Sequence, residues 1–226
     1  MRRRTTQAEY FDAPDRSVED VAEGYRLLGR INRIFRFADP FQKLIPSRFG
    51  PENCQRLSLL DLGAGDGSLG RELSEWAAAR GWDWKITCLD LSPVALSLNP
   101  NPRHVVGSVL NLPFRDQSFD VVIATQMTHH LTSNADVVRH FEEAWRVSRR
   151  GVLIYDLHRN PLLYSVVAVL LTTLRMPAHF RSDGLLSVRR GWRVNEWRDL
   201  AAAAKIPQAE VWLEHGARIT LLAQRR

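Results

Sequence analysis

The stretch LLDLGAGDGSLG, residues 59 to 70, places four glycines and two aspartates directly after a run of leucines. Glycines at the carboxyl end of a strand let a ligand touch the main chain. Gly65, Gly67 and Gly70 satisfy G-x-G-x-x-G, which alone is weak evidence for a dinucleotide. Asp61, at the mouth of the loop, would repel a pyrophosphate and favours a ligand that bears a cation, such as an ammonium or a sulfonium.

A second acidic residue ends the next expected strand, in WKITCLDLS. Asp90 is placed there to accept hydrogen bonds from the ribose hydroxyls of an adenosine. Dinucleotides and adenosyl ligands both need such an acceptor, so Asp90 indicates a nucleoside without choosing between them.

These motifs resemble those of the class I S-adenosylmethionine-dependent methyltransferases, especially the small-molecule branch with its ubiquinone/menaquinone and polyketide-tailoring types. The family motif D-x-G-x-G-x-G matches residues 61 to 67, its second acid matches Asp90, and a third segment matches GSVLNLPFRDQSFDVV. The resemblance covers residues 57 to 157 well and the last strands more loosely. Ser108 departs from it, because the family has an aspartate there that contacts the adenine amino group.

The resemblance implies S-adenosyl-L-methionine as the cofactor. Its expected ligands are Asp61, Gly63, Ala64, Gly65, Gly67, Asp90, Leu91, Ser108, Val109 and Gln126. Transfer from a sulfonium is an in-line displacement, so the protein supplies position and, for hydroxyl acceptors, removal of a proton.

The segment IATQMTHHL ends another expected strand and brings two histidines to the same edge. A neutral imidazole, with an ordinary pKa of about 6.5, can take a proton from a phenol or an acidic carbon. We expect His129 to be the base, with His130 as the alternative. A structural role, in which one histidine bonds to the backbone, stays open, and no metal ligand set is expected.

Four residues are expected to line the acceptor site: Phe35, His158, Asn160 and Tyr164. For His158, Asn160 and Tyr164, which follow the fifth strand, helix capping and loop hydrogen bonding are the alternative roles. The expected reaction is O-methylation of a lipophilic or aromatic acceptor of phenolic or polyketide type, with C-methylation of a quinone precursor second. A nicotinamide-dependent oxidoreductase and a non-catalytic cofactor-binding scaffold are the alternatives from other classes.

The positions of these residues depend on an alternation of short apolar runs with helical ones. Strands are predicted at 57–61, 84–90, 104–109, 119–125 and 151–157, and helices at 68–80, 92–98 and 133–148. Such alternation predicts an α/β doubly wound, mostly parallel sheet of Rossmann-like type. Two further strands, 209–215 and 217–224, flank Gly216 and predict that the seven-stranded sheet ends in an antiparallel hairpin.

Two segments lie outside this predicted fold. Residues 1–50 predict a helical extension or lid, with a helix from Ser17 to Phe37 capped by Ser17 and a short segment closed by Pro46. Residues 51–226 form the expected methyltransferase domain, with an insertion at about 158–192. The insertion predicts a helix at 161–175 and an arginine-rich loop, HFRSDGLLSVRRGWR, before a helix at 194–205.

Composition limits the partners. The net charge of +6 is partly concentrated at the two ends of the chain, in Arg2, Arg3, Arg4, Arg225 and Arg226, which are expected to be solvated. The motif [DNS]-P-P-[YFW], typical of nucleic-acid amino-methyltransferases, does not follow the fourth strand. We therefore expect no nucleic-acid partner. Two cysteines without metal spacing and a charged N-terminus without a signal peptide predict a cytoplasmic protein. The most apolar stretch, 161–174, is shorter than the roughly 20 residues that span a bilayer. We expect a monomer or homodimer without an integral membrane segment, and a peripheral membrane contact stays open.

Overall fold

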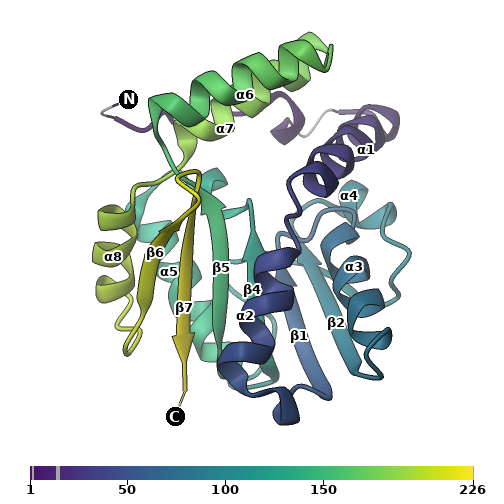
Figure 1. Cartoon of the computed structure of the whole chain (residues 1–226), viewed down its shortest axis with the longest axis vertical. Helices are drawn as coiled ribbons and strands as arrows, with labels where there is room; N and C mark the ends of the chain where they lie inside the picture. Colours follow the sequence, from purple (N-terminus) through teal and green to yellow (C-terminus); the bar gives the residue numbers. More distant parts are fainter. Residues whose placement is uncertain (2, 14–15, 226) are drawn as a thin grey trace.

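The computed structural model describes residues 1, 3–13 and 16–225. Its centre is a seven-stranded sheet with the order β3-β2-β1-β4-β5-β7-β6 (Figure 1). The strands are Arg56–Leu62 (β1), Asp83–Asp90 (β2), His104–Val106 (β3), Phe119–Thr125 (β4), Ser148–Leu157 (β5), Glu210–Glu214 (β6) and Arg218–Gln224 (β7). The first five strands are parallel, and β7 runs antiparallel to both β5 and β6. The predicted fold class is confirmed.

Helices cover both faces of the sheet, as a parallel sheet requires. They are Val18–Ile34 (α1), Asp39–Phe49 (α2), Ser68–Ala78 (α3), Pro93–Ser97 (α4), Asn134–Val147 (α5), Pro161–Thr173 (α6), Ala178–Arg190 (α7) and Val194–Ala203 (α8), with 3-10 turns at Tyr10–Asp12 (η1), Pro51–Asn53 (η2) and Thr128–His130 (η3). One core contains Phe41 of α2 and Leu73 of α3, and the other contains Phe141 of α5 and Trp197 of α8. The sheet is therefore a rigid platform, and the loops at its carboxyl edge carry the site.

The N-terminal helices agree with the prediction except at one proline. Ser17 caps α1, since its side chain accepts a hydrogen bond from the Asp20 amide, as predicted. The segment expected to close at Pro46 instead continues as α2 to Phe49. Buried Phe41, Ile45 and Phe49 share one face of α2, and their packing against the sheet outweighs the hydrogen bond that a proline removes.

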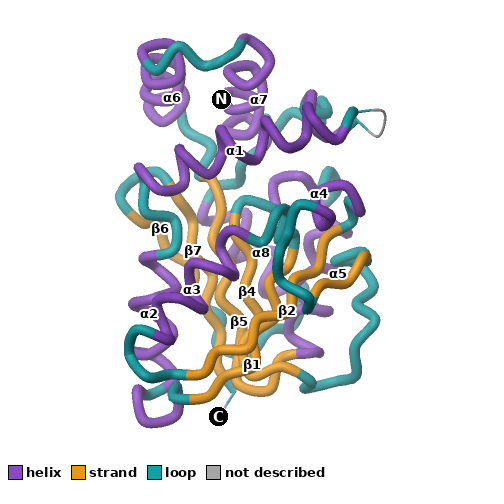
Figure 2. The backbone as a smooth tube through the Cα atoms, turned by 90° about the vertical axis from the view of Figure 1, so that its right-hand side faces the viewer, coloured by secondary structure: helices purple, strands orange, loops and turns teal. Residues whose placement is uncertain are grey.

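The arginine-rich segment after α6 was wrongly expected to be a loop, because residues 178–190 form the helix α7. Its apolar residues are sparse, but Phe180, Leu186 and Val188 are buried. Gly184 allows α6 to pack closely, since a Cβ atom there would lie 2.7 Å from Leu171 Cδ1. The hairpin of α6 and α7 lies beyond the carboxyl edge of the sheet, and α1 approaches the same edge (Figures 1 and 2).

Among the described residues, no helix is both long and apolar enough to cross a membrane.

Candidate functional site

The glycine loop follows β1 and bends at three positions that favour glycine. Gly63, Gly65 and Gly67 have φ angles of 69°, 54° and 70°. The amides of Gly63 and Ala64 donate to the carbonyl of Leu89 at 2.8 and 3.0 Å. The loop is thus tied to the end of β2, and its strained turns need residues without a Cβ atom.

Asp61 is buried at the end of β1, and its Oδ2 atom has no hydrogen-bond partner among the residues that the structure describes. Burial, reinforced by the nearby carboxylates of Asp90 and Asp66, raises the pKa of Asp61 to about 8. A buried carboxyl group without donors is costly to a fold. The same group suits the cationic end of a bound ligand, so the residues present fit the expected cofactor.

Asp90 lies at the end of β2, beside the glycine loop. Its Oδ2 atom accepts a hydrogen bond from the Gly65 amide and its Oδ1 atom accepts one from the Ser92 amide, both at 2.8 Å. These bonds fix the carboxylate and leave lone pairs on each oxygen for ligand hydroxyls. The neighbouring Leu91 is 72% exposed.

Ser108 follows β3, and its hydroxyl oxygen accepts a hydrogen bond from the Leu110 amide at 3.2 Å. The hydroxyl proton is left for a ligand acceptor, which an aspartate would not offer. Val109 packs against the core that also contains Leu89.

Helix α1 lies over the glycine loop. A Cβ atom at Gly65 would overlap the ring of Tyr25, and Gln126 donates from its side-chain amide to Asn32 Oδ1 at 3.1 Å. Burial and the carboxylates of Asp90 and Asp66 raise the pKa of Tyr25 above its ordinary range. Tyr25 and Asn32 are not among the site residues that the sequence predicted, although their seven-residue spacing places both on one helix face.

His129 and Asp156 form a buried pair between η3 and the end of β5. The Nδ1 atom of His129 lies 2.7 Å from Asp156 Oδ1, and the His129 amide donates to Oδ2 at the same distance. Burial raises the pKa of Asp156, but the charge and hydrogen bonds of His129 outweigh it and lower the pKa. When His129 is neutral, the carboxylate fixes the ring with Nδ1 as the donor, which leaves Nε2 as the acceptor.

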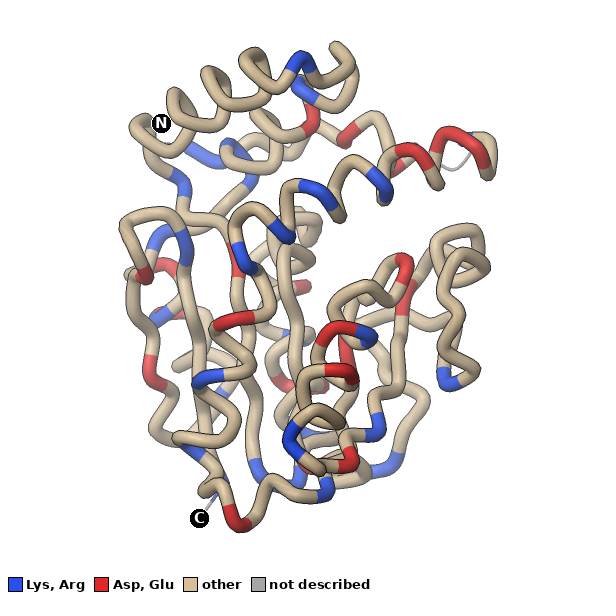
Figure 3. Tube along the Cα trace, turned by 45° about the vertical axis from the view of Figure 1, so that its right-hand side comes forward, with Lys and Arg blue, Asp and Glu red and all other residues tan. Residues whose placement is uncertain are grey.

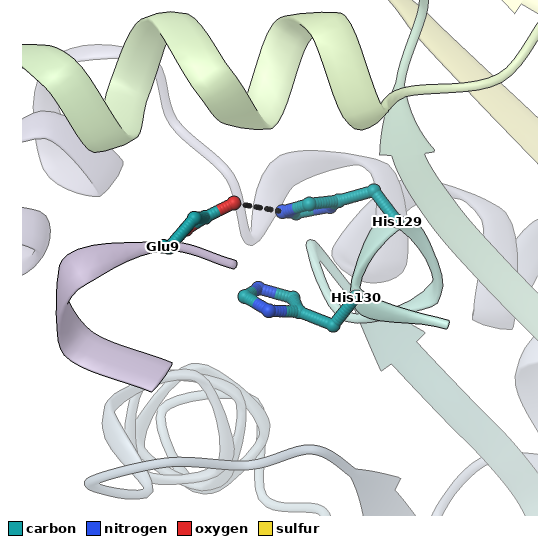
Figure 4. A group of neighbouring side chains, drawn as sticks. All are labelled: Glu9, His129 and His130. Atoms are coloured by element: carbon teal, nitrogen blue, oxygen red, sulfur yellow. Dashed lines mark ion pairs between the residues drawn. The ribbon is translucent and has the colours of Figure 1, made fainter. Parts of the chain in front are cut away.

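Glu9 faces that free nitrogen. Its Oε1 atom lies 3.7 Å from His129 Nε2, and the His130 ring lies beside the His129 ring at a tilt of 37°, on the same side of η3 (Figure 4). His130 Nδ1 lies 3.0 Å from Asp12 Oδ1. Desolvation alone would lower the pKa of His130, but Asp12 and Glu9 raise it.

Residues 3–12 form a strap across the two histidines, fixed by two arginines. Arg190 of α7 donates to the carbonyls of His129 and His130 and lies 2.8 Å from Asp12 Oδ2. Arg4 donates to the carbonyls of His129 and Leu131 and stacks on Trp192, and burial lowers its pKa to about 10.

The expectation that the terminal arginines are solvated is therefore wrong for Arg4. It is also wrong for Arg225, which donates to the carbonyls of Ser148 and Trp145. Arg2 and Arg226 lie outside the described residues. Sequence reasoning missed Glu9 and Asp12 as well, because nothing in the local pattern links residues 120 positions apart in the chain.

Glu9, His129 and His130 bring ligand atoms within 4.8 Å of one another, a combination that could hold a divalent cation. Arg190 lies 3.6 Å from Glu9 and 2.8 Å from Asp12. Its guanidinium already supplies positive charge to these carboxylates. We therefore interpret the cluster as an ion-pair network.

The expected acceptor residues lie in two places. Phe35 is 38% exposed and packs edge to face on Phe37 at the end of α1. Asn160 caps α6 and donates to Gly216, and its amide contacts His158 Nδ1 at 3.0 Å. This favours the capping role for Asn160. His158 lines a separate hollow of about 370 Å³ with Arg193 and Glu196, and Tyr164 lies half-buried on α6.

Comparisons with known proteins agree with this geometry. A family model described as a methyltransferase domain matches residues 60–155. A demethylmenaquinone methyltransferase of Roseiflexus sp. (strain RS-1) is 33% identical over 125 residues, which cover 50% of this chain and 48% of that protein. The match thus spans about half the length of this curated relative.

Two solved structures share the fold at low identity. A candidate S-adenosyl-L-methionine-dependent methyltransferase of Methanococcus maripaludis has a TM-score of 0.62 and 20% identity, covering 97% of this chain and 95% of that one. Magnesium protoporphyrin IX methyltransferase of Synechocystis PCC 6803, solved with S-adenosylhomocysteine, has a TM-score of 0.54 and 13% identity, covering 84% and 83%. At such identities the likeness establishes the fold alone.

Proposed function

Because residues 60–155 form a methyltransferase domain of the class I S-adenosylmethionine-dependent type, as their motifs predicted, we propose that this chain methylates the hydroxyl group of a small lipophilic or aromatic acceptor. The observation that carries the proposal is the buried His129–Asp156 pair at the carboxyl edge of the sheet. O-methylation of a neutral phenol needs a base at this edge, whereas cofactor binding alone does not.

The cofactor residues support the first part of the proposal. When bound, S-adenosyl-L-methionine supplies an electrophilic methyl group on a sulfonium. Asp61 binds the cationic end of this ligand, Asp90 accepts hydrogen bonds from its ribose hydroxyls, and the glycine loop gives it room. Ser108 and Val109 contact the adenine, and Gln126 borders the site from the end of β4.

The histidine pair supports the second part. His129 Nε2 accepts the acceptor's hydroxyl proton as the oxygen bonds to the methyl group. Asp156 stabilises the imidazolium that results, and it holds the ring in the tautomer that leaves Nε2 free. His130, which bonds to Asp12 instead, is the second choice for the base.

The elements above the edge support a lipophilic acceptor. Leu27 of α1, Leu171 of α6 and Phe180 of α7 form an apolar cluster outside the two main cores. We propose that residues 1–50 and the insertion at 158–192 together make a lid, whose underside carries apolar side chains to the acceptor. Phe35 and Tyr164 belong to this lid, and Glu9 must give way for a hydroxyl group to reach His129 Nε2.

C-methylation of a quinone precursor is the second candidate, favoured by the likeness to demethylmenaquinone methyltransferase. In that case His129 removes the proton from the ring carbon after the methyl group has been attached. The same pair would serve both reactions, and the position of the methyl group in the product distinguishes them.

Calorimetric titration with S-adenosylhomocysteine and, separately, with NAD⁺ tests the cofactor assignment. We expect binding of the first ligand only, because the acidic Asp61 pairs with a cationic group once it loses its proton, whereas it offers a pyrophosphate no positive partner. Binding of NAD⁺ alone would overturn the proposal in favour of an oxidoreductase. Binding of S-adenosylhomocysteine without turnover of any phenol or quinol would favour a non-catalytic scaffold.

A further inference from the structure

The outer face of α6 is aliphatic and has no protein partner among the described residues. Leu162, Val166 and Val169 are 75%, 50% and 67% exposed. Their spacing of four and three residues places all three on one face of the helix. Residues 161–174 contain no charged side chain at all, although α6 lies on the outside of the molecule (Figure 3). A solvent-facing helix of a globular protein ordinarily carries charges there.

The inner face of α6 packs on α7 and leaves a shallow hollow between the two helices. The hollow measures about 280 Å³ and is lined by small and aliphatic side chains, among them Ala168, Leu171 and Leu185, with Arg181 beside them. Thr172 and Ser182 add hydroxyl groups to the lining. Aliphatic side chains next to a guanidinium and hydroxyl groups fit the boundary between an acyl chain and its phosphate group.

The exposed charges of the hairpin are all positive. Between residues 158 and 193 the only acid is Asp183, which is buried and accepts the amides of Tyr10 and Phe11 at 2.8 and 3.2 Å. Arg175 and Arg189 are exposed and Arg181 is partly exposed. In the part of the chain that the structure describes, none of these three guanidinium groups has a carboxylate partner. The surface is thus complementary to an array of anions.

We propose that the α6–α7 hairpin docks on an anionic lipid surface. Leu162, Val166 and Val169 enter the boundary between headgroups and acyl chains, and Arg175, Arg181 and Arg189 bind lipid phosphates. A second copy of the chain fits this face less well. Two hairpins facing each other would oppose unpaired arginines, and three aliphatic side chains fall short of the roughly 800 Å² per partner that a stable dimer buries.

Docking through this hairpin would bring the proposed active site close to the membrane. The hairpin, which belongs to the proposed lid, lies beyond the carboxyl edge of the sheet (Figure 2). A membrane-dissolved acceptor would therefore meet the protein on the side of this edge. The docking itself does not require methyl transfer. It can be measured on the cofactor-free chain without any acceptor.

Flotation of the whole chain with lipid vesicles tests the proposal. The vesicles are phosphatidylcholine alone or phosphatidylcholine mixed with phosphatidylglycerol. We expect binding to the mixed vesicles that weakens in high salt, with each arginine contributing about fivefold to the partition. Val166→Glu/Val169→Glu should lower the partition at least about tenfold, since it places charge in the acyl boundary. Arg175→Glu/Arg181→Glu should abolish the preference for anionic vesicles.

Leu213→Glu is the matched control, because Leu213 is 41% exposed on strand β6, outside the α6–α7 hairpin. It should leave the partition unchanged. Thermal unfolding and S-adenosylhomocysteine binding verify that every variant is folded. A wild-type chain that does not bind S-adenosylhomocysteine would count against the proposed function, not against docking. Equal flotation of wild type and Val166→Glu/Val169→Glu, or none with either vesicle, would overturn the proposal. The proposal would also be overturned if the wild type were a dimer and Val166→Glu/Val169→Glu a monomer, because the face would then be an interface between two copies of the chain.

Discussion

The Nδ1 atom of His129 lies 2.7 Å from Oδ1 of Asp156, and both side chains are buried at the carboxyl edge of the sheet. The two residues are 27 positions apart: His129 lies in η3, which follows β4, and Asp156 lies near the end of the neighbouring strand β5, so the sheet sets their contact. A carboxylate in this position orients the imidazole and stabilises its protonated form. The pair is what distinguishes this edge from a site that only holds a cofactor.

Substitution of His129 should impair turnover more than substitution of His130. We expect His129→Ala to lower kcat by about 100-fold or more, in the range of a lost general base. His130→Ala should cost less than about tenfold, because His130 pairs with Asp12 and is not held by Asp156. Steady-state kinetics with saturating cofactor measures both. Equal losses in the two variants would contradict the assignment of the base.

Asp156 should act as a positioning residue. Asp156→Asn keeps the volume of the side chain but allows the His129 ring to take the wrong tautomer. We expect kcat to fall at least about tenfold and its pH profile to shift, while the affinity for S-adenosylhomocysteine stays unchanged. A variant that loses cofactor affinity and kcat in parallel, with an unaltered pH profile, would point to a purely structural role.

Cofactor binding should release a proton from Asp61. In the free protein the pKa of this carboxyl group is about 8, raised by burial. The folded chain therefore holds a proton that the unfolded chain loses near pH 4, and its stability falls as pH rises towards 8. A bound cation favours the ionised form of Asp61 instead, so the proton is released when the ligand binds. Calorimetry at pH 6.5 in buffers of different ionisation enthalpy should show close to one proton released, and Asp61→Asn should show none.

The affinity of the Asp61→Asn variant provides the second measure. We expect S-adenosylhomocysteine to bind at least about tenfold more weakly, since a neutral amide replaces the partner of its cation. Unchanged affinity would mean that the ligand does not reach the end of β1.

Crowding at the glycine loop can be separated from backbone strain. Gly67 and Gly81 have similar φ angles of 70° and 75°, but a Cβ atom at Gly67 would overlap Asn99 whereas one at Gly81 meets nothing. Each alanine variant should lose roughly 1–2 kcal/mol of unfolding free energy from the left-handed backbone. Only Gly67→Ala should lose more than this and bind S-adenosylhomocysteine poorly. Urea denaturation and calorimetry compare the two, and equal behaviour would contradict a binding role for the loop.

The strap over the histidines should loosen at both ends of the pH range. The pKa of Asp12 is lowered in the folded chain, where His130 and Arg190 offset the effect of its burial, so its contribution is present above about pH 4 and lost in stronger acid. The pKa of His130 is raised, so its contribution is present below about pH 6.5 and lost as pH rises further. Amide exchange of residues 3–12, corrected for the intrinsic rate, should be slowest between these limits. Asp12→Asn should remove this dependence, and a flat profile in the wild type would disprove the linkage.

The sequence predicted the fold because each strand and helix of the sheet domain has a strong local pattern. The leucines of β1, the glycine loop and the acid at the end of β2 are neighbours along the chain, so their arrangement follows from the strand order. The failures have physical causes as well. In α2 a buried apolar face outweighs Pro46, and in α7 a helix with few apolar residues is held by its contacts with α6 and η1.

The site was predictable only where it is local. Asp61 and Asp90 lie at the ends of β1 and β2, and the two histidines follow β4. The sheet order places these three strands side by side and brings the residues to one edge. Glu9 lies 120 positions from His129 in the chain, and Asp12 and Arg190 lie 118 and 60 positions from His130, so no periodicity of the sequence encodes these contacts. Tyr25 likewise meets the glycine loop only because α1 folds back over it.

The most direct test of the account is the position of a transferred methyl group. The chain is incubated with S-adenosylmethionine labelled with deuterium in its methyl group and with a long-chain phenol, and the product is analysed by mass spectrometry and NMR. We predict a deuterated methyl group on the phenolic oxygen and its loss in His129→Ala. A label on a ring carbon, or no labelled product from a wild-type chain that binds S-adenosylhomocysteine, would contradict the account.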